Sequence, residues 1–196
     1  MREALRINQA ARAGGSARSA RGFTLIEALV VVALVALLLS FALPAGSLWL
    51  QRQRLGHAAE LLLSDLHLAR SEAVHGARNI LLRITETAAG TCYVIHSGPV
   101  NGCLCALAGP PSCLADAQAL KQAQWPRRSG YPNLLSNVPT LLFSGRQGTV
   151  SLAATLRMAT QGIGEVTHVV SITGRIRSCA ADGSFMRWPA CEGQQS

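Results

Sequence analysis

The sequence predicts an α+β protein, in which one long N-terminal helix packs on an antiparallel β-sheet head. Three observations support this fold class. No charged residue occurs from Ala28 to Leu50, and apolar residues then recur every three or four positions as far as Ala73. The second half of the chain alternates short apolar segments with turn residues. The first two patterns are typical of a helix and the third of strands, and a sheet with an apolar face is commonly buried against a helix.

The composition excludes a disordered chain and favours a membrane segment. The chain has 196 residues, of which 49% are hydrophobic and 14% are charged, and its mean hydropathy is +0.25. Disordered proteins have few apolar and many charged residues. The length allows one domain with an anchor or a tail. Aromatic residues make up only 5%, which leaves few of the stacking surfaces that single-strand nucleic-acid binders use.

The N-terminal pattern predicts a single membrane span with the body of the protein outside the cytoplasm. Residues 1–22 carry +4 of the formal net charge of +8, and arginines ahead of a span keep that end in the cytoplasm. The uncharged run that follows has 23 residues, enough for a helix to cross a bilayer core of roughly 30 Å. An ordinary secretory signal cut near Ser40-Phe41-Ala42 is the alternative. Against it stand Glu27, a carboxylate inside the apolar stretch, and a helical pattern that continues past Pro44.

Three segments carry a family resemblance. Arg21-Gly22-Phe23-Thr24-Leu25-Ile26-Glu27 resembles the class III signal of type IV pilins and type II secretion pseudopilins, and residues 62–73 and 169–177 resemble the GspH/FimT branch of that family. The resemblance implies a pilin-like fold, cleavage by a prepilin peptidase between Gly22 and Phe23, and N-methylation of Phe23. It also implies a minor pilin or pseudopilin of the cell inner membrane, which assembles with other pilins into a filament for protein secretion or pilus biogenesis.

The resemblance divides the chain into four parts: a cleaved cytoplasmic leader (1–22), a transmembrane half of the helix (23–50), an amphipathic half (51–76) and a periplasmic β-rich head (77–196). Glu27 is expected to pair with the amine of Phe23 in a neighbouring subunit, because a lone carboxylate costs about 2.5–3.5 kcal/mol at the bilayer centre. The alternative is a Glu27 that reaches the membrane interface without a partner. Pro44 should kink the helix, since proline removes an intrahelical hydrogen bond.

Beyond Pro44 the expected buried stripe of the helix contains Leu55, Ala58, Leu62, Leu66, Ala69 and Ala73, with Asp65 mostly off that stripe and a stop at Gly76. Strands are expected at 80–84 and 93–95, joined across 88–90, and again at 140–143, 150–158 and 168–177. Residues 97–139 are expected to form a Gly/Pro-rich insertion with a short helical stretch near 114–123.

Six cysteines follow the membrane segment, and an even number outside the cytoplasm predicts disulfide bonds. The favoured pairs are Cys179–Cys191, Cys92–Cys103 and Cys105–Cys113. Zinc is the alternative, although the spacing of Cys103 and Cys105 is tighter than that of usual zinc pairs. No metal and no cofactor is expected.

The sequence has no G-x-S-x-G elbow, H-E-x-x-H pair or phosphate loop, so no catalytic residue is expected, and a membrane-anchored periplasmic enzyme is a remote alternative. Its five histidines are scattered and are expected to be surface or packing residues. A function in filament assembly is therefore favoured over catalysis.

Arg175 and Arg177 are the candidate DNA-binding residues. On a strand they would project to one face about 6.6–6.8 Å apart, close to the spacing of phosphates along a nucleic-acid strand. Residues that would widen the patch are Lys121, Arg127, Arg128, Arg146 and Arg187. A FimT-type minor pilin that binds DNA in natural transformation is the alternative function that this implies, and a solvated strand end with Arg–Glu pairs is the alternative to binding.

Overall fold

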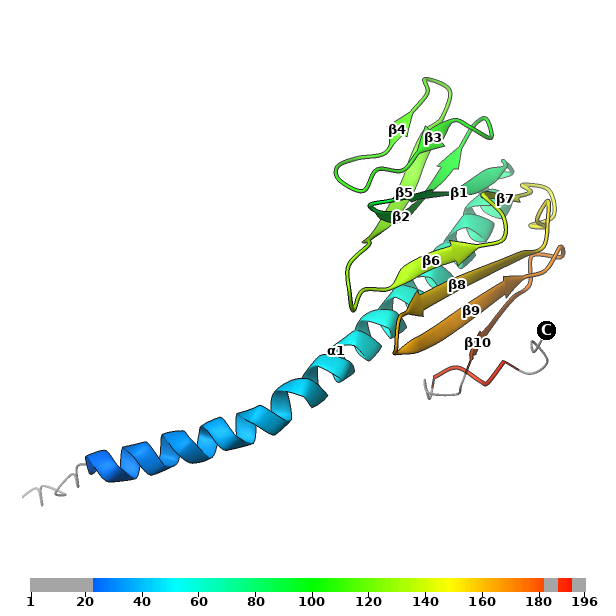
Figure 1. Ribbon diagram of the computed structural model, residues 1–196. Helices are drawn as coiled ribbons and strands as arrows, with labels where there is room; N and C mark the ends of the chain where they lie inside the picture. The colour runs from blue at the N-terminus through cyan, green and yellow to red at the C-terminus, as the bar shows by residue number, and fades with distance from the viewer. Residues whose placement is uncertain (1–22, 182–186, 192–196) are drawn as a thin grey trace, which may run out of the picture. The chain divides into compact units, whose positions relative to one another are not determined.

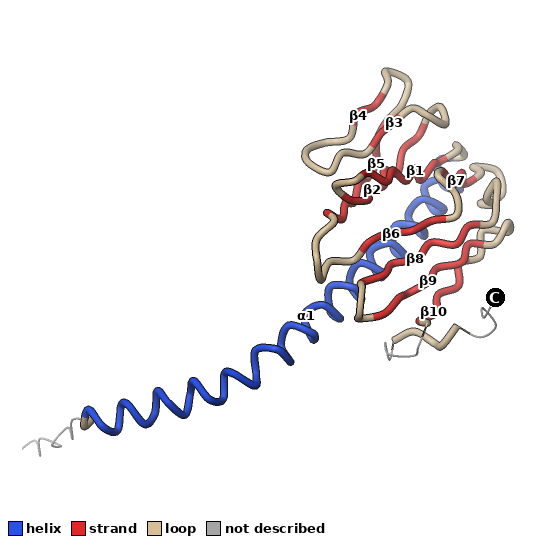
Figure 2. The backbone as a smooth tube through the Cα atoms, viewed as in Figure 1, coloured by secondary structure: helices blue, strands red, loops and turns tan. Residues whose placement is uncertain are grey.

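The computed structural model describes residues 23–181 and 187–191, with the backbone alone at 41–45. The chain forms two compact units that divide between Ala42 and Leu43. The first contains the beginning of helix α1. The second contains the rest of α1 and every strand, and Figures 1 and 2 show its strands gathered around that part of the helix.

Helix α1 runs from Leu25 to Gly76. Its first turn is capped by Thr24, whose Oγ1 accepts a hydrogen bond from the backbone N–H of Glu27 at 3.3 Å. Its last turn closes with two backbone bonds, from the N–H of Ala77 to Val74 at 3.4 Å and from the N–H of Arg78 to Ala73 at 3.2 Å. This is the Schellman arrangement, and it confirms the predicted stop at Gly76.

The kink expected at Pro44 stays a prediction. Within the described residues, no helix is both long enough and apolar enough to cross a bilayer.

In the part of the chain that the structure describes, ten strands follow the helix and form two four-stranded antiparallel sheets and one short hairpin. The first sheet has the order β5-β2-β1-β7 and the second the order β10-β9-β8-β6, while β3 pairs with β4. The strands are β1 (Ile80–Thr87), β2 (Gly90–Ser97), β3 (Cys103–Leu104), β4 (Ser112–Cys113), β5 (Gln118–Pro126), β6 (Asn133–Ser136), β7 (Thr140–Phe143), β8 (Ala154–Thr160), β9 (Gly164–Val170) and β10 (Ile176–Ala180). The predicted α+β class, with a helix on antiparallel strands, is confirmed.

Both sheets bury one face against the second half of α1. The six apolar positions predicted for the helix stripe are all buried, from Leu55 to Ala73, and they share one core with the inward residues of both sheets. Tyr93 and Ile95 represent the first sheet in this core, and Leu156 and Met158 the second. Burial of such side chains contributes about 1.5–3 kcal/mol each, so the helix is the common support of the two sheets.

Part of the expected insertion belongs to the two sheets. Residues 118–126 form β5, which pairs with β2 along its whole length, and residues 133–136 form β6 beside β8. The helical stretch predicted near 114–123 is therefore wrong. Its Ala, Leu and Lys residues favour helix locally, but burial of Ala123 and Trp125 against the core outweighs that weak preference.

Residues 98–117 connect β2 to β5 outside the two four-stranded sheets, and we call this segment the disulfide flap. It contains the β3–β4 hairpin and covers the outer face of the first sheet, where Val94 and His96 are fully buried although they point away from α1. The side chain of Gln122 on β5 holds the flap by bonding both the N–H and the C=O of Ala106, each at 3.1 Å.

The strand expected at 168–177 is two strands. β9 ends at Val170, a turn follows at 171–175, and β10 begins at Ile176. Gly174 lies in that turn with φ of 76°, and a side chain there would meet the carbonyl oxygen of Gly148. Glycine is required at this position because the two loops touch through their backbones.

Candidate functional site

Arg175 and Arg177 line one hollow on the outer face of the second sheet. Arg175 immediately precedes β10, and Arg177 lies on it opposite Val169 of β9. The hollow holds about 670 Å³ and is bounded on its other side by residues 189–191. Among the described residues neither guanidinium has a carboxylate within ion-pair distance.

The five other cations considered for this patch do not line the hollow. Three of them pair with carboxylates: Lys121 with Asp65, Arg127 with Glu86 and Arg187 with Glu60. Arg128 and Arg146 are exposed in other loops. The hollow therefore offers two cations and not a broad basic face.

A buried polar cluster ties the helix to the first sheet. Asp65 is fully buried on α1. It accepts a hydrogen bond from the hydroxyl of Tyr93 at 2.6 Å and forms an ion pair with Lys121 at 2.5 Å. Burial, strengthened by the bond to Asp65, raises the pKa of Tyr93 above its ordinary value. The expectation that Asp65 lies off the buried stripe is wrong. It follows Leu62 by three residues and precedes Ala69 by four, which is the spacing of that stripe.

The two histidines near the strands are both packing residues. His96 lies under the disulfide flap, its Nε2 has no hydrogen-bond partner among the described residues, and burial lowers its pKa. His168 lies between the second sheet and α1, with Nδ1 at 2.7 Å from Oγ of Ser178 and its ring edge-on to Trp188. Burial lowers the pKa of His168 to about 4, although the backbone of Ala59 partly opposes the shift.

All six cysteines are joined in disulfides. Cys179 pairs with Cys191, as the sequence analysis favoured, and this bond holds residues 189–191 beside the arginine hollow. The other two pairs were predicted wrongly: Cys92 bonds Cys105 and Cys103 bonds Cys113. Because Cys103 lies on β3 opposite Cys113 on β4, this pairing closes the flap hairpin. The first pair then fixes the flap to β2. No thiolate is left for the zinc alternative.

The N-terminal motif is described from Phe23 onward, and Gly22 lies outside the described residues. Phe23 and the first turns of α1 are exposed, Glu27 included. The spacing of Thr24 and Glu27 is that of a capping box, in which the fourth residue is Glu or Gln. Glu27 therefore has a local structural role open to it besides pairing between subunits.

Fold and motif together define a class: a chain whose N-terminal methylation signal continues into a helix that carries a two-sheet β head. The prokaryotic N-terminal methylation motif matches residues 17–43. The family described as type II transport protein GspH matches residues 58–174, which is more than half of the chain. The protein belongs to this family of minor pilins and pseudopilins.

Two solved proteins are similar to this chain. One is the type IV minor pilin FimU of Pseudomonas aeruginosa, with 25% identity and a TM-score of 0.48 over 66% of this chain and 90% of FimU. The other is the minor pseudopilin EpsH from the type 2 secretion system of Vibrio cholerae, with 15% identity and a TM-score of 0.46 over 66% of this chain and 98% of EpsH. No curated protein matches the sequence.

Proposed function

We propose that this chain is a minor subunit of a type II secretion pseudopilus or a type IV pilus, held in the inner membrane until it is drawn into the filament. The observation that carries the proposal is the presence of both matches on one chain, the methylation motif and the GspH region, linked by helix α1. The motif supplies membrane storage and assembly, and the head supplies the surface that distinguishes this subunit.

In this proposal residues 1–22 are a cytoplasmic leader, residues 23–50 lie in the membrane, and residues 51–196 are periplasmic, with 51–76 as the helix that carries the head. A prepilin peptidase cuts after Gly22 and Phe23 becomes N-methylated. The amine of Phe23 then meets Glu27 of a neighbouring subunit, because an apolar filament core leaves either charge costly without a partner.

The processing step is tested by mass spectrometry of the protein extracted from membranes. The expected mature chain begins at Phe23 and carries one added methyl group. Gly22→Ala should still be cleaved, whereas Gly22→Leu should leave the leader attached, because the bulky side chain would not fit the peptidase. A mature chain beginning at Leu43 would contradict the proposal and favour an ordinary signal peptide.

A second candidate function is DNA binding in natural transformation, favoured by two arginines that line one hollow and have no carboxylate partner within the described ranges. Phosphate contacts give sequence-independent binding, with a dissociation constant in roughly the 10⁻⁴–10⁻⁶ M range. Two contacts predict a log–log salt slope of about −1.8, at about −0.9 for each contact.

The test is fluorescence anisotropy of duplex DNA with the full chain in a neutral detergent, measured across a salt series. Arg175→Ala/Arg177→Ala should abolish most of the slope. The control Arg146→Ala/Arg157→Ala removes the same charge outside the hollow and should retain it. Equal slopes for the two double variants would exclude the hollow as the DNA site.

A further inference from the structure

Four arginines occur on α1 just beyond its uncharged run and in a loop that contacts this part of the helix. Arg52 and Arg54 follow Leu50 directly on the helix, and Arg127 and Arg128 lie in the β5–β6 loop. Figure 1 shows that this loop lies beside α1. We call these four residues the basic collar.

Two contacts place the β5–β6 loop against α1 at the level of Gln51 and Arg54. The guanidinium of Arg54 lies 4.8 Å from the centre of the Tyr131 ring. A Cβ added to Gly130, which has φ of 73°, would lie 3.0 Å from Cδ of Gln51. Arg52 and Arg54 are separated by about 3 Å of helix rise, and Arg128 precedes the contacting Gly130 by two residues, so the loop brings its arginines to the same stretch of the helix.

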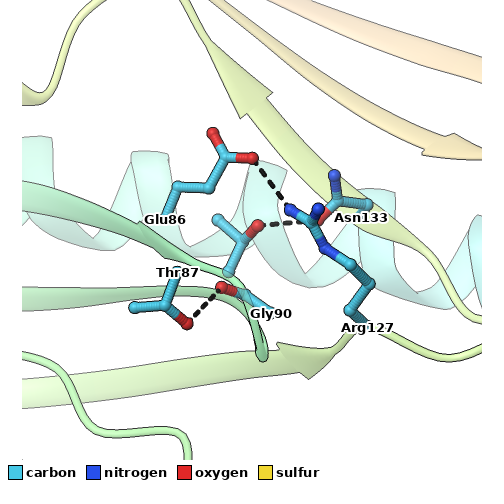
Figure 3. A network of polar contacts seen from close by, with 6 residues as sticks. Glu86, Thr87, Gly90, Arg127 and Asn133 are labelled. Atoms are coloured by element: carbon cyan, nitrogen blue, oxygen red, sulfur yellow. Dashed lines mark hydrogen bonds and ion pairs between the residues drawn. The ribbon is translucent and has the colours of Figure 1, made fainter.

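The collar loop is held at both ends, as Figure 3 shows. At its start, the Arg127 guanidinium donates to Glu86 at 3.0 Å, and the Arg127 N–H donates to the carbonyl of Ala89 at 2.8 Å. At its end, the hydroxyl of Thr91 donates to Oδ1 of Asn133 at 2.6 Å. The β1–β2 hairpin therefore fixes the loop, and the loop does not need a ligand to take this position.

Most arginines of the collar form no ion pair among the described residues. Arg52, Arg54 and Arg128 are exposed and have no carboxylate partner among the described residues. Exposed apolar side chains lie directly before them on the helix, Leu48, Trp49 and Leu50. Tryptophan and tyrosine are the residues enriched where a membrane meets water.

Arginines at this place run against the charge rule for topology. Lys and Arg close to a span favour the cytoplasmic side, yet the proposed orientation puts the collar on the outer side. Residues 1–22 still outweigh it with five arginines. A favourable interaction on the outer side of the membrane would offset the unfavourable effect of these arginines on the membrane topology.

We propose that the basic collar binds the phosphate groups of anionic phospholipids at the outer surface of the membrane and seats the head on the bilayer before the subunit is drawn into the filament. The inference rests on the membrane span of the proposed function. Each arginine near an anionic surface contributes about a fivefold preference for it, and Arg54 retains its stack on Tyr131 while its free N–H groups face the phosphates.

The test places the full chain in lipid nanodiscs made of phosphatidylcholine alone or with phosphatidylglycerol, and follows hydrogen exchange of the amides of residues 128–130. Exchange should be at least about fivefold slower in the anionic discs, by the preference of a single arginine. The difference should vanish in high salt, because screening weakens exposed charges.

Variants separate the collar from general charge and from folding. R52Q/R54Q/R128Q should exchange equally in both discs, and R52K/R54K/R128K should keep the slower exchange because it keeps the charge. The matched control R78Q/R146Q/R157Q loses three arginines elsewhere and should behave as the wild type.

Two results would overturn the collar alone: equal exchange of the wild type in both discs, or lipid-dependent slowing that survives in R52Q/R54Q/R128Q. Elution of the full chain without either disc would instead contradict the membrane span, and the collar with it.

Discussion

The two sheets of the head are built alike but buried differently. Both pack one face on α1, yet the disulfide flap covers the other face of the first sheet, while the second sheet has exposed side chains on its other face. Outward residues of the first sheet, such as Val94, are fully buried, whereas Arg157 and Arg177 on the second sheet are exposed.

The difference in burial suggests that the two sheets have different roles. The first sheet buries the polar cluster of Asp65, Tyr93 and Lys121, which fixes the head on the helix. The second sheet keeps the arginine hollow open. We infer that stability is concentrated on the first sheet and surface recognition on the second, and four measurements test that division.

The largest effect is expected for Asp65→Ala. The change leaves the Tyr93 hydroxyl buried without a partner and Lys121 without its counter-ion, at a cost of about 3–5 kcal/mol in the free energy of unfolding. Glu165→Ala on the second sheet breaks the partly exposed ion pair with Arg157 at 3.7 Å and removes the acceptor of the Thr167 hydroxyl, and it should cost only about 1–2 kcal/mol. Urea unfolding of the full chain in detergent measures both, and similar losses would remove the division of tasks.

The next comparison removes one disulfide from each sheet. Cys92–Cys105 and Cys179–Cys191 close loops of similar separation, 13 and 12 residues, so each should contribute about 3 kcal/mol through the entropy of the unfolded chain. C92A/C105A should cost more than C179A/C191A, because it also loosens the cover over Val94 and Leu81. Thermal unfolding of the two variants gives the difference, and a larger loss from C179A/C191A would contradict it.

Acid should act through the second sheet. The folded pKa of His168 is about 4, against 6.5 in the unfolded chain. Above pH 6.5 the residue is neutral in both states. As the pH falls from 6.5 toward 4, only the unfolded state gains the proton, so up to about 3 kcal/mol of stability is lost. His168→Gln should make the free energy of unfolding nearly independent of pH between pH 5 and 6.5. The control His57→Gln, at an exposed histidine, should keep the pH dependence of the wild type. The same pH dependence in both variants would assign the loss of stability to other groups.

The smallest effect is expected at the C-terminal end of α1. Ala77 has φ of 47°, a left-handed conformation that an alanine side chain disfavours. Ala77→Gly should therefore raise the free energy of unfolding by about 0.5–1 kcal/mol, after the extra freedom of glycine in the unfolded chain is subtracted. Denaturant unfolding would show it, and a loss of stability would mean that the strain at Ala77 is relieved elsewhere.

The sequence predicted correctly the elements that are determined by residues close together in the chain. The helix stripe from Leu55 to Ala73, the stop at Gly76 and the strand at 140–143 follow from spacing and turn residues. β5 was missed because its alanines and leucine favour helix until β2 pairs with them.

The candidate sites depended on contacts that the sequence does not reveal. Asp65 was misplaced because its charge argued against burial, and its partners Tyr93 and Lys121 are distant in the chain. The spacing of Asp65 on the helix stripe was nevertheless a usable signal. The flap pairings follow from the register of β3 and β4, which no cysteine spacing gives.

The central claim is assembly into a filament through the charge of Glu27, and Glu27→Gln tests it most directly. Glutamine keeps the capping-box side chain next to Thr24 but removes the charge, so helix capping and charge pairing are separated. The account predicts wild-type amounts of the variant in the membrane and a large loss from sheared filaments, similar to that of Glu27→Ala. Recovery of Glu27→Gln in filaments at the wild-type level would contradict charge pairing and leave Glu27 a helix cap.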